Sequence, residues 1–342
     1  MAHALTHRVA RPLTYRRAGV DVAGKSRLLE ALGPLVARTL GSDISPWGGF
    51  AGVLRLPGGA DRLALTVDGV GTKTLLARRL GQDRMVGADI VAHCANDLAA
   101  AGARPLGFAD YVAMGRLDAA VLEALLEGMS EACRRLGIPL VGGETAEMPG
   151  VYREGAYDVA GAMVGLVDAE LGPAQVRPGD RIIGLASTGL HTNGYSLARR
   201  LVEGRDLRRH RAALGGSLGE ALLAPHRCYA PALWRLFAAL PVHAAAHITG
   251  GGLPGNITRV LPPRLQARLE PAWPVPPIFP FLQRLGALDQ EEMRRVFNLG
   301  VGMVLLVAPA DAPRALALLQ EAGEEAWPVG EVVPGERGVV FG

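Results

Sequence analysis

Short groups of glycines that follow apolar runs constrain the fold of this chain more than any other feature. Glycine accounts for 45 of the 342 residues, roughly twice its average share of about 7 %. The groups lie at residues 69–71, 142–143, 189–194 and 250–255. In α/β proteins, ligands gather at the ends of strands, where such turns stand. The pattern therefore predicts strand–turn–helix units whose glycine turns are candidate ligand sites.

Hydrophobic periodicity predicts alternating strands and helices in two halves of similar size. Predicted strands are Arg62–Val67, Phe108–Met114, Ile138–Val141 (buried), Tyr157–Val167, Arg181–Ala186, Gln266–Leu269 and Val301–Val307. Predicted helices are Leu75–Leu80, Val86–Ala101, Leu117–Leu136, one from Tyr195, Glu220–Leu240 broken at its prolines, and Asp311–Ala322. Linker residues near 172–180 divide the chain. We expect an α/β (α+β) protein with domains at residues 1–170 and 171–342.

Composition excludes several classes of protein. With 36 Lys+Arg and 33 Asp+Glu, the net charge of +3 is too weak to favour nucleic acid. The apolar stretches fall short of the ~20 residues of a membrane span, and Met1–Thr14 has no signal-peptide core. Three separated cysteines form no disulfide framework, and the motifs of zinc proteases and α/β-hydrolases are missing from the sequence. We expect a cytoplasmic, soluble protein.

The segment Asp68–Lys73 (DGVGTK) follows a predicted strand and precedes a helix. Bare backbone at Gly69 and Gly71 lets phosphate oxygens approach N–H groups at a helix start. Asp68 can bind a divalent cation, and Lys73 can neutralise a phosphate. The alternative is an ordinary Asp-Gly turn beside a solvated lysine. The segment is neither a Walker A loop nor a dinucleotide fingerprint.

Two further carboxylates extend this pattern. Asp97, after Asn96, lies on a helix that is otherwise apolar, and Glu144 follows Gly142-Gly143. A solvent-facing side chain is the simplest interpretation of Asp97, because an ionised carboxylate on an apolar helix is costly unless it is exposed, capped or bound to metal. Three acidic groups at such places suit Mg²⁺, which takes carboxylates, water and phosphate oxygens.

Polar groups also accompany the turns of the second half. His191 and Asn193 stand in a turn between strand and helix and can donate to a phosphate, although a helix N-cap explains them equally well. His247 precedes Gly250-Gly251-Gly252, an anion loop rather than a Rossmann site because no long helix follows. The remaining histidines (His3, His7, His93, His210, His226 and His243) lack ligand spacing, which favours surface or packing roles.

In their joint order these segments resemble the phosphoribosylformylglycinamidine cyclo-ligase family (aminoimidazole ribonucleotide synthetases) over nearly the whole chain. The resemblance rests on Thr14–Asp21, Asp68–Lys73, Asn96–Leu98, Gly142–Gly150, Asp158–Gly161, Gly189–Ser196 and Thr249–Asn256. It implies two α/β domains, the N-terminal one for ATP, magnesium and dimerisation, and a homodimer whose N-terminal sheets form a barrel. The implied reaction of purine biosynthesis converts formylglycinamidine ribonucleotide and ATP to aminoimidazole ribonucleotide, ADP and phosphate.

The resemblance also implies residue roles. Asp68, Asp97 and Glu144 would bind Mg²⁺–ATP, with Lys73 as the phosphate cation beside Gly69, Gly71 and Thr72. His191 and Asn193 would lie near a phosphate, His247 in the substrate pocket, and Gly250, Gly251 and Gly252 on the ribose 5-phosphate. Nucleic acid and membranes are not expected partners. Two alternatives remain: a small-molecule kinase of the same superfamily, such as thiamine-monophosphate kinase, and a non-catalytic nucleotide-binding subunit.

Overall fold

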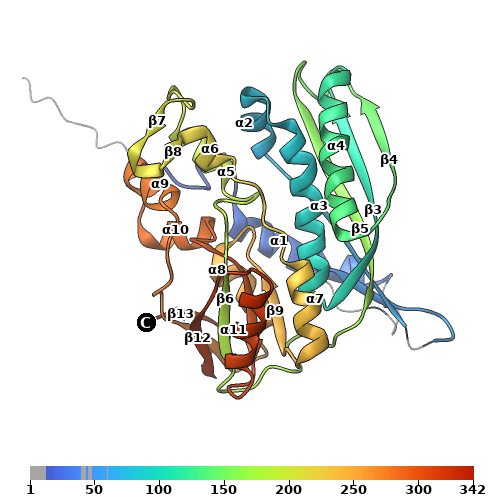
Figure 1. Cartoon of the computed structure of the whole chain (residues 1–342), viewed down its shortest axis with the longest axis vertical. Coiled ribbons are helices and arrows are strands. Elements are labelled where there is room, and N and C mark those ends of the chain that lie inside the picture. Colours follow the sequence, from blue (N-terminus) through green and yellow to red (C-terminus); the bar gives the residue numbers. More distant parts are fainter. Residues whose placement is uncertain (1–12, 40–43, 45–47, 60) are drawn as a thin grey trace, which may run out of the picture.

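Two mixed sheets and the helices packed on them make up the fold (Figure 1). The computed structural model describes residues 13–39, 44, 48–59 and 61–342. His3, His7 and most of Met1–Thr14 therefore lie outside the described residues. No helix in the described part of the chain combines the length and the apolar character that a bilayer crossing requires.

The first sheet has the strand order β1-β2-β5-β3-β4. Its strands are β1 (Gly52–Arg55), β2 (Arg62–Gly69), β3 (Ala103–Met114), β4 (Leu140–Glu147) and β5 (Tyr157–Val167). β3 and β4 are parallel, and the other neighbours are antiparallel. The helices of this half are α1 (Val22–Ala37), α2 (Lys73–Leu80), α3 (Asp83–Ala100) and α4 (Ala119–Leu136), of which α3 and α4 cover one face of the sheet.

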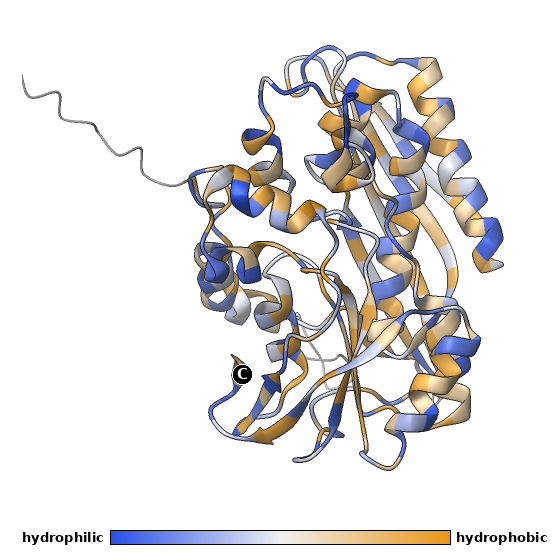
Figure 2. Ribbon diagram, turned by 60° about the vertical axis from the view of Figure 1, so that its left-hand side comes forward, coloured by the Kyte–Doolittle hydropathy of each residue, from blue (hydrophilic) through white to orange (hydrophobic). Residues whose placement is uncertain are grey.

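The second sheet has the order β13-β10-β12-β6-β11-β9. Its strands are β6 (Arg181–Ala186), β9 (Ala244–His247), β10 (Leu265–Leu269), β11 (Val301–Val307), β12 (Ala326–Pro334) and β13 (Gly338–Phe341). The two-residue strands β7 (His210–Arg211) and β8 (Gly216–Ser217) form a separate hairpin. The helices are α5 (Tyr195–Leu201), α6 (Leu218–Leu222), α7 (Ala230–Ala239), α8 (Gly252–Ile257), α9 (Ile278–Gly286), α10 (Gln290–Val296) and α11 (Ala312–Glu321). Figure 2 shows hydrophobic and hydrophilic residues alternating along helices, as expected where one face of a helix is buried.

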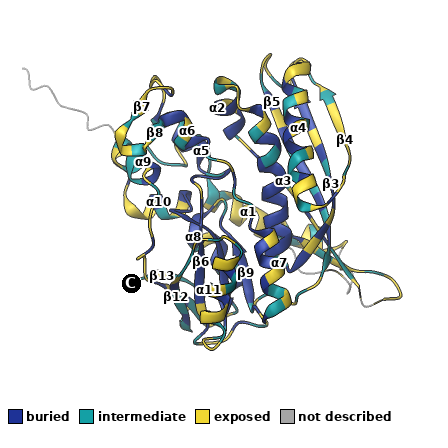
Figure 3. Cartoon of the chain, viewed as in Figure 1, coloured by how far each residue is buried: buried dark blue, intermediate teal, exposed yellow. Residues whose placement is uncertain are grey.

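Helix α3 joins the two halves of the molecule. It contacts β2, β3, β5 and α4 on the side of the first sheet, and α7 and β9 of the second half. Figure 3 shows α3 buried over nearly its whole length. One continuous apolar core consequently runs from the first sheet through α3 to one face of the second sheet, and a smaller core fills the other face of that sheet.

Most predicted elements are confirmed, and the structure differs from expectation at one strand, at one proline and at one helix that was not predicted. The predicted buried strand Ile138–Val141 is β4, which starts at Leu140, runs through Gly142-Gly143-Glu144 and is an exposed edge strand. The predicted helix Glu220–Leu240 is broken as expected around Pro225, between α6 and α7, whereas Pro231 lies in the first turn of α7, where proline is tolerated, and breaks nothing. Helix α1 was not predicted, although Leu28, Leu32 and Leu35 recur along it at helical spacing; these leucines are exposed.

Candidate functional site

Asp68 stands at the end of β2, on the face of the sheet that α3 covers. The left-handed backbone of Gly71 (φ 65°) turns the chain into α2, as the glycine pattern predicts. Asp68 Oδ1 accepts a hydrogen bond from the Gly69 N–H (2.7 Å), and its Oδ2 lies 2.8 Å from His93 Nε2. The carboxylate is partly exposed and thus open to a ligand from solvent.

One polar stripe of α3 faces this carboxylate. Asp89, His93 and Asp97 follow one another at four-residue spacing, so they lie on one face of the helix. All three are buried. Each of these residues is followed directly by one of the apolar residues Ile90, Cys94 and Leu98, whose four-residue spacing predicted the helix. The stripe was therefore visible in the sequence, and the interpretation of His93 as a surface or packing histidine missed its place in the site.

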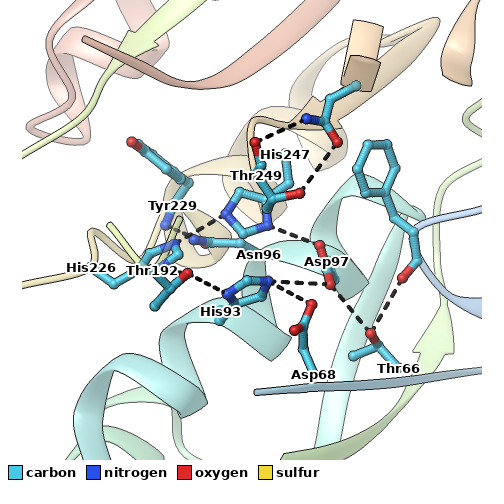
Figure 4. Close-up of polar contacts among 12 residues, drawn as sticks. Thr66, Asp68, His93, Asn96, Asp97, Thr192, His226, Tyr229, His247 and Thr249 are labelled. Atoms are coloured by element: carbon cyan, nitrogen blue, oxygen red, sulfur yellow. Dashed lines mark hydrogen bonds and ion pairs between the residues drawn. The ribbon is translucent and has the colours of Figure 1, made fainter. Parts of the chain in front are cut away.

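Asp97 is buried and hydrogen-bonded, so the solvent-facing interpretation was wrong. Its Oδ1 accepts a hydrogen bond from His247 Nδ1 (2.9 Å), and its Oδ2 accepts one from Thr66 Oγ1 (3.4 Å), as Figure 4 shows. The neighbouring Asn96 donates to the carbonyl of Arg227 and accepts from the N–H of Tyr229. Helix α3 is thereby tied to the loop before α7 and to the end of β9.

Four histidines from four segments meet behind these carboxylates: His93 on α3, His191 after β6, His226 before α7 and His247 at the end of β9 (Figure 4 shows all but His191). His93 Nδ1 is 2.8 Å from Thr192 Oγ1, and His226 Nε2 is 3.1 Å from His247 Nε2. The rings of His191 and His226 stack at 4.2 Å. The expectation of a surface or packing role for His226 therefore missed this cluster, because no spacing in the sequence signals a contact between separate loops.

The four histidines of the cluster differ in protonation, because only His93 lies against Asp68. Burial alone would raise the pKa of Asp68 and lower that of His93, but their close contact outweighs it. The imidazolium of His93 lowers the pKa of Asp68 to about 2, and the carboxylates of Asp68, Asp97 and Asp89 raise the pKa of His93 to about 9. Burial instead lowers the pKa of His191, His226 and His247. At neutral pH the cluster holds one charged and three neutral imidazoles.

Glycine turns of both halves come together beside this cluster. Thr72 Oγ1, in the Asp68–Lys73 turn, is 3.2 Å from Ser196 Oγ, at the start of α5. A Cβ on Gly250 would lie 3.3 Å from Asn193 Oδ1, so the triple-glycine loop passes directly beside that side chain. A Cβ on Gly252 would overlap the carbonyl of Arg294, which together with its φ of 61° explains the glycine there. Three of the predicted ligand turns are neighbours.

Lys73 lies beside the junction where these glycine turns of the two halves meet, but its ammonium group is already paired with a carboxylate. Its Nζ lies 2.6 Å from Asp89 Oδ2 and donates to the carbonyl of Ala224 at 3.0 Å. The side chain is fully buried, beside the ring of Tyr195. In this conformation its charge neutralises Asp89, and the expectation of a solvated lysine was wrong. Its role as the phosphate cation stays a prediction.

Glu144 lies apart from the other carboxylates within one chain. It stands in β4 opposite Tyr111, whereas Gly143 pairs with Asp110, in the same row of the sheet as Asp68. Three strand spacings of about 4.8 Å put roughly 14 Å between these positions. Because Glu144 is one residue away from Gly143, it points to the opposite, uncovered face of the sheet. Its role as a metal ligand also stays a prediction.

The chain belongs to the AIR synthase related family. The model of the N-terminal domain of that family matches residues 48–167, and the model of the C-terminal domain matches residues 177–342. Together the two models cover most of the chain.

Named relatives show to which enzymes of this family the chain is most similar in sequence. Phosphoribosylformylglycinamidine cyclo-ligase from Sorangium cellulosum is 47 % identical, with 96 % of this chain and 99 % of the relative covered. The protein of that name from Nitrosococcus oceani is 45 % identical, with 94 % and 92 % covered. The predicted membership of the cyclo-ligase family, and with it the ligase function in purine biosynthesis, is confirmed by these relatives.

Solved structures agree on the fold. The crystal structure of tt0281 from Thermus thermophilus aligns with a TM-score of 0.66 at 25 % identity, covering 94 % of this chain and 97 % of the other. Thiamine-monophosphate kinase from Stenotrophomonas maltophilia aligns with a TM-score of 0.62 at 21 % identity, covering 92 % and 95 %. The kinase shares the fold, whereas the relatives that match at high identity are cyclo-ligases.

Proposed function

We propose that the junction of the two halves is the active site, where formylglycinamidine ribonucleotide and ATP react to give aminoimidazole ribonucleotide, ADP and phosphate. The observation that carries this assignment is the meeting of Asp68 and Asp97 with the glycine turns of the second half. Carboxylates and bare backbone N–H groups at one place are what a magnesium-bound triphosphate requires.

Asp68 and Asp97 are the proposed ligands of Mg²⁺. The pKa of Asp68, held at about 2, keeps this carboxylate ionised, and its partial exposure leaves room for a hydrated cation. Held by Asp68 and Asp97, the ion would neutralise the charge that develops in phosphoryl transfer. Gly69, Gly71 and Thr72 would contact the ATP phosphates, and Asn193 with Gly250–Gly252 would bind the substrate's 5-phosphate.

The buried histidines act behind this surface. The ring of His247 donates to Asp97 and so fixes the direction in which that carboxylate points. His191 adopts a left-handed backbone (φ 60°), a conformation uncommon outside glycine, and its ring lies against Gly302, where a Cβ would overlap the ring. We therefore propose that His247 and His191 support catalysis by positioning groups at the junction. Lys73 would join the phosphate site by leaving Asp89.

The reaction needs two bond-forming steps. The formyl amide oxygen attacks the γ-phosphorus of ATP, and ADP leaves. The amidine nitrogen then attacks the activated carbon, the ring closes, and phosphate leaves with the former amide oxygen while one proton is released. Such chemistry depends on positioning and charge neutralisation more than on a covalent enzyme intermediate.

A homodimer would explain the uncovered face of the first sheet. Large apolar side chains stand exposed there: Leu65, Val67, Tyr111 and Val141. An apolar sheet face of this kind marks an interaction surface, and two such faces packed together would form the predicted barrel. In this proposal residues 1–170 bind ATP and dimerise, residues 171–342 bind the substrate, and Glu144 lies on the dimer side of the sheet.

Incubation of the purified protein with ATP, Mg²⁺ and formylglycinamidine ribonucleotide tests the function. We expect aminoimidazole ribonucleotide and ADP in equal amounts. A phosphorylated acceptor without ring closure, either with this substrate or with thiamine monophosphate, would instead support the kinase alternative. Nucleotide binding without any turnover would support a non-catalytic subunit.

Substitution of the proposed metal ligand tests the site. Asp68→Asn should lower Mg²⁺-dependent kcat by about 100-fold or more, because it removes a charge that acts in the transition state. Asp206→Asn, at an exposed position of the second half, is the matched control and should keep wild-type turnover. Full turnover in Asp68→Asn, with an unchanged requirement for magnesium, would exclude Asp68 as a ligand.

A further inference from the structure

The proposed reaction does not account for why three imidazole rings crowd together inside the molecule. His191, His226 and His247 each offer a ring nitrogen, and these three atoms lie within 4.8 Å of one another. All three side chains are buried. Their facing Nε2 atoms place His226 and His247 3.1 Å apart, close to the roughly 3.3 Å between two ligands of a tetrahedral zinc with Zn–N bonds of about 2.0–2.1 Å.

The outer nitrogens of the cluster are held as in known metal sites. His247 donates its Nδ1–H to the carboxylate of Asp97, which turns the unprotonated Nε2 toward the other rings. His226 Nδ1 lies 3.4 Å from the hydroxyl of Thr192. Metal-binding histidines almost always have such a second hydrogen bond, and a carboxylate is a common partner.

His191 supplies a third, independent indication. Its Nδ1 is buried and has no hydrogen-bond partner among the described residues. The other ring nitrogen, Nε2, lies 3.3 Å from the Thr188 N–H, a long contact that would be given up when Nε2 takes the ring proton and Nδ1 binds a metal. A buried polar atom without a partner costs about 1–3 kcal/mol, and a metal ion in the cluster would give this ring a ligand role.

We propose that His191, His226 and His247 bind one divalent transition-metal ion of the zinc type. Nitrogen donors select such an ion over Mg²⁺, which prefers oxygen. Its charge would face the carboxylate of Asp97, behind His247, while Asp89, already paired with Lys73, holds the backbone N–H of His226 through its Oδ1 at 2.8 Å. Three protein ligands leave the fourth position to a water molecule. The ion would fix two loops of the second half and the end of β9, and through His247 it would fix Asp97.

A neighbouring set, His93 with Asp97 and His247, has similar spacing. His93 is already occupied there by Asp68 and Thr192. That set belongs to the carboxylate site described above, and the new site therefore uses the other three histidines.

Metal content measures the proposal directly. Protein produced in zinc-supplemented medium and passed over a chelating resin should retain about one zinc per chain by elemental analysis. His226→Gln should retain at least five-fold less, whereas His210→Gln, at an exposed position of the β7–β8 hairpin, should match the wild type. Wild-type protein with less than about 0.2 zinc per chain, or His226→Gln with wild-type zinc, would overturn the proposal.

Cobalt gives a second readout that does not depend on the folding of a variant. Wild-type protein produced with Co²⁺ in place of zinc should show the visible absorption bands of a low-coordinate site, and X-ray absorption should show nitrogen and oxygen neighbours with imidazole scattering. Sulfur neighbours, or a six-coordinate aqueous spectrum, would place the ion elsewhere and contradict the assignment.

Discussion

Asp68 and His93 illustrate how a residue acquires its charge from its neighbours. His93 on the buried helix α3 would lose its proton through desolvation, and it keeps the proton because three carboxylates surround it. Asp68 stays ionised in turn because the imidazolium is 2.8 Å away. This pair makes the stability of the protein depend on pH.

The sign of that dependence follows from the pKa shifts. His93 has a folded pKa of about 9 against 6.5 unfolded, so its stabilisation is complete below pH 6.5 and is lost as pH rises through about 9. Asp68, shifted from 3.8 down to about 2, stabilises above pH 3.8 and loses this effect as pH falls through about 2. Wild-type protein should therefore exceed His93→Gln in unfolding free energy by a margin that shrinks, by on the order of 2 kcal/mol, between about pH 6 and 9.5.

Urea titrations of both proteins at several pH values measure this margin. A margin that stays constant over that range would show that His93 is neutral in the folded protein.

Lys73 and Asp89 form a buried ion pair between α2 and α3. Lys73→Met should lower the unfolding free energy by about 3–5 kcal/mol, because it leaves a buried carboxylate without its partner. Burial raises the pKa of Asp89 against the opposing effect of the lysine, so the orphaned carboxyl would take up a proton. The double variant Lys73→Met/Asp89→Leu should recover much of the loss in urea unfolding.

The same variants distinguish the two roles of Lys73. If Lys73→Met is nearly as stable as the wild type but has a greatly raised KM for ATP, the lysine acts on phosphate and the ion pair is incidental.

At the scale of elements, two glycines decide how closely α3 and α4 pack. A Cβ on Gly87 would lie 2.0 Å from the carbonyl oxygen of Leu125, and one on Gly128 would lie 1.9 Å from that of Arg84. The backbone of each helix therefore packs directly against the glycine of the other. No periodicity in the sequence reveals this contact, since glycine is read as a helix weakener rather than a packing position.

Gly128→Ala should accordingly destabilise the protein by about 1–3 kcal/mol, because the added methyl group forces the helices apart. Gly33→Ala is the matched control, since α1 leaves open space around that position. At Gly33 the same change should stabilise the folded protein by about 0.4–1 kcal/mol, because alanine lowers the conformational entropy of the unfolded chain. Thermal unfolding of both variants gives the comparison, and a stable Gly128→Ala protein would show that the two helices can separate without cost.

At the scale of the whole molecule, the first sheet has one covered and one uncovered face. Val67 points outward from β2 and is two-thirds exposed. In the proposed homodimer Val67→Glu would bury a charge at the centre of the interface, so we expect a dimeric wild type and a monomeric variant by light scattering. Val340→Glu, at an exposed apolar position of β13 in the second sheet, is the control and should remain dimeric. A wild-type monomer at micromolar concentration would refute the barrel.

Local patterns in the amino-acid sequence were enough to predict most elements and several of the polar groups that meet at the candidate site. Periods of two and four residues predict strands such as Tyr157–Val167 and helices such as α4, because side-chain direction follows directly from backbone repeat. Glycine turns and isolated carboxylates likewise predict where phosphate and metal can bind, because a few consecutive residues supply the backbone N–H groups and the carboxylate that such binding requires.

Which of these groups meet became apparent in the packed molecule alone. The fold brings His93 to Asp68 and His226 to His247, pairs Lys73 with Asp89, and leaves Glu144 on the far face of the sheet. These outcomes depend on strand order and on the contact of α3 with both halves, which involve residues up to 150 positions apart. Burial and pairing across such separations arise from tertiary packing, and no local pattern encodes them.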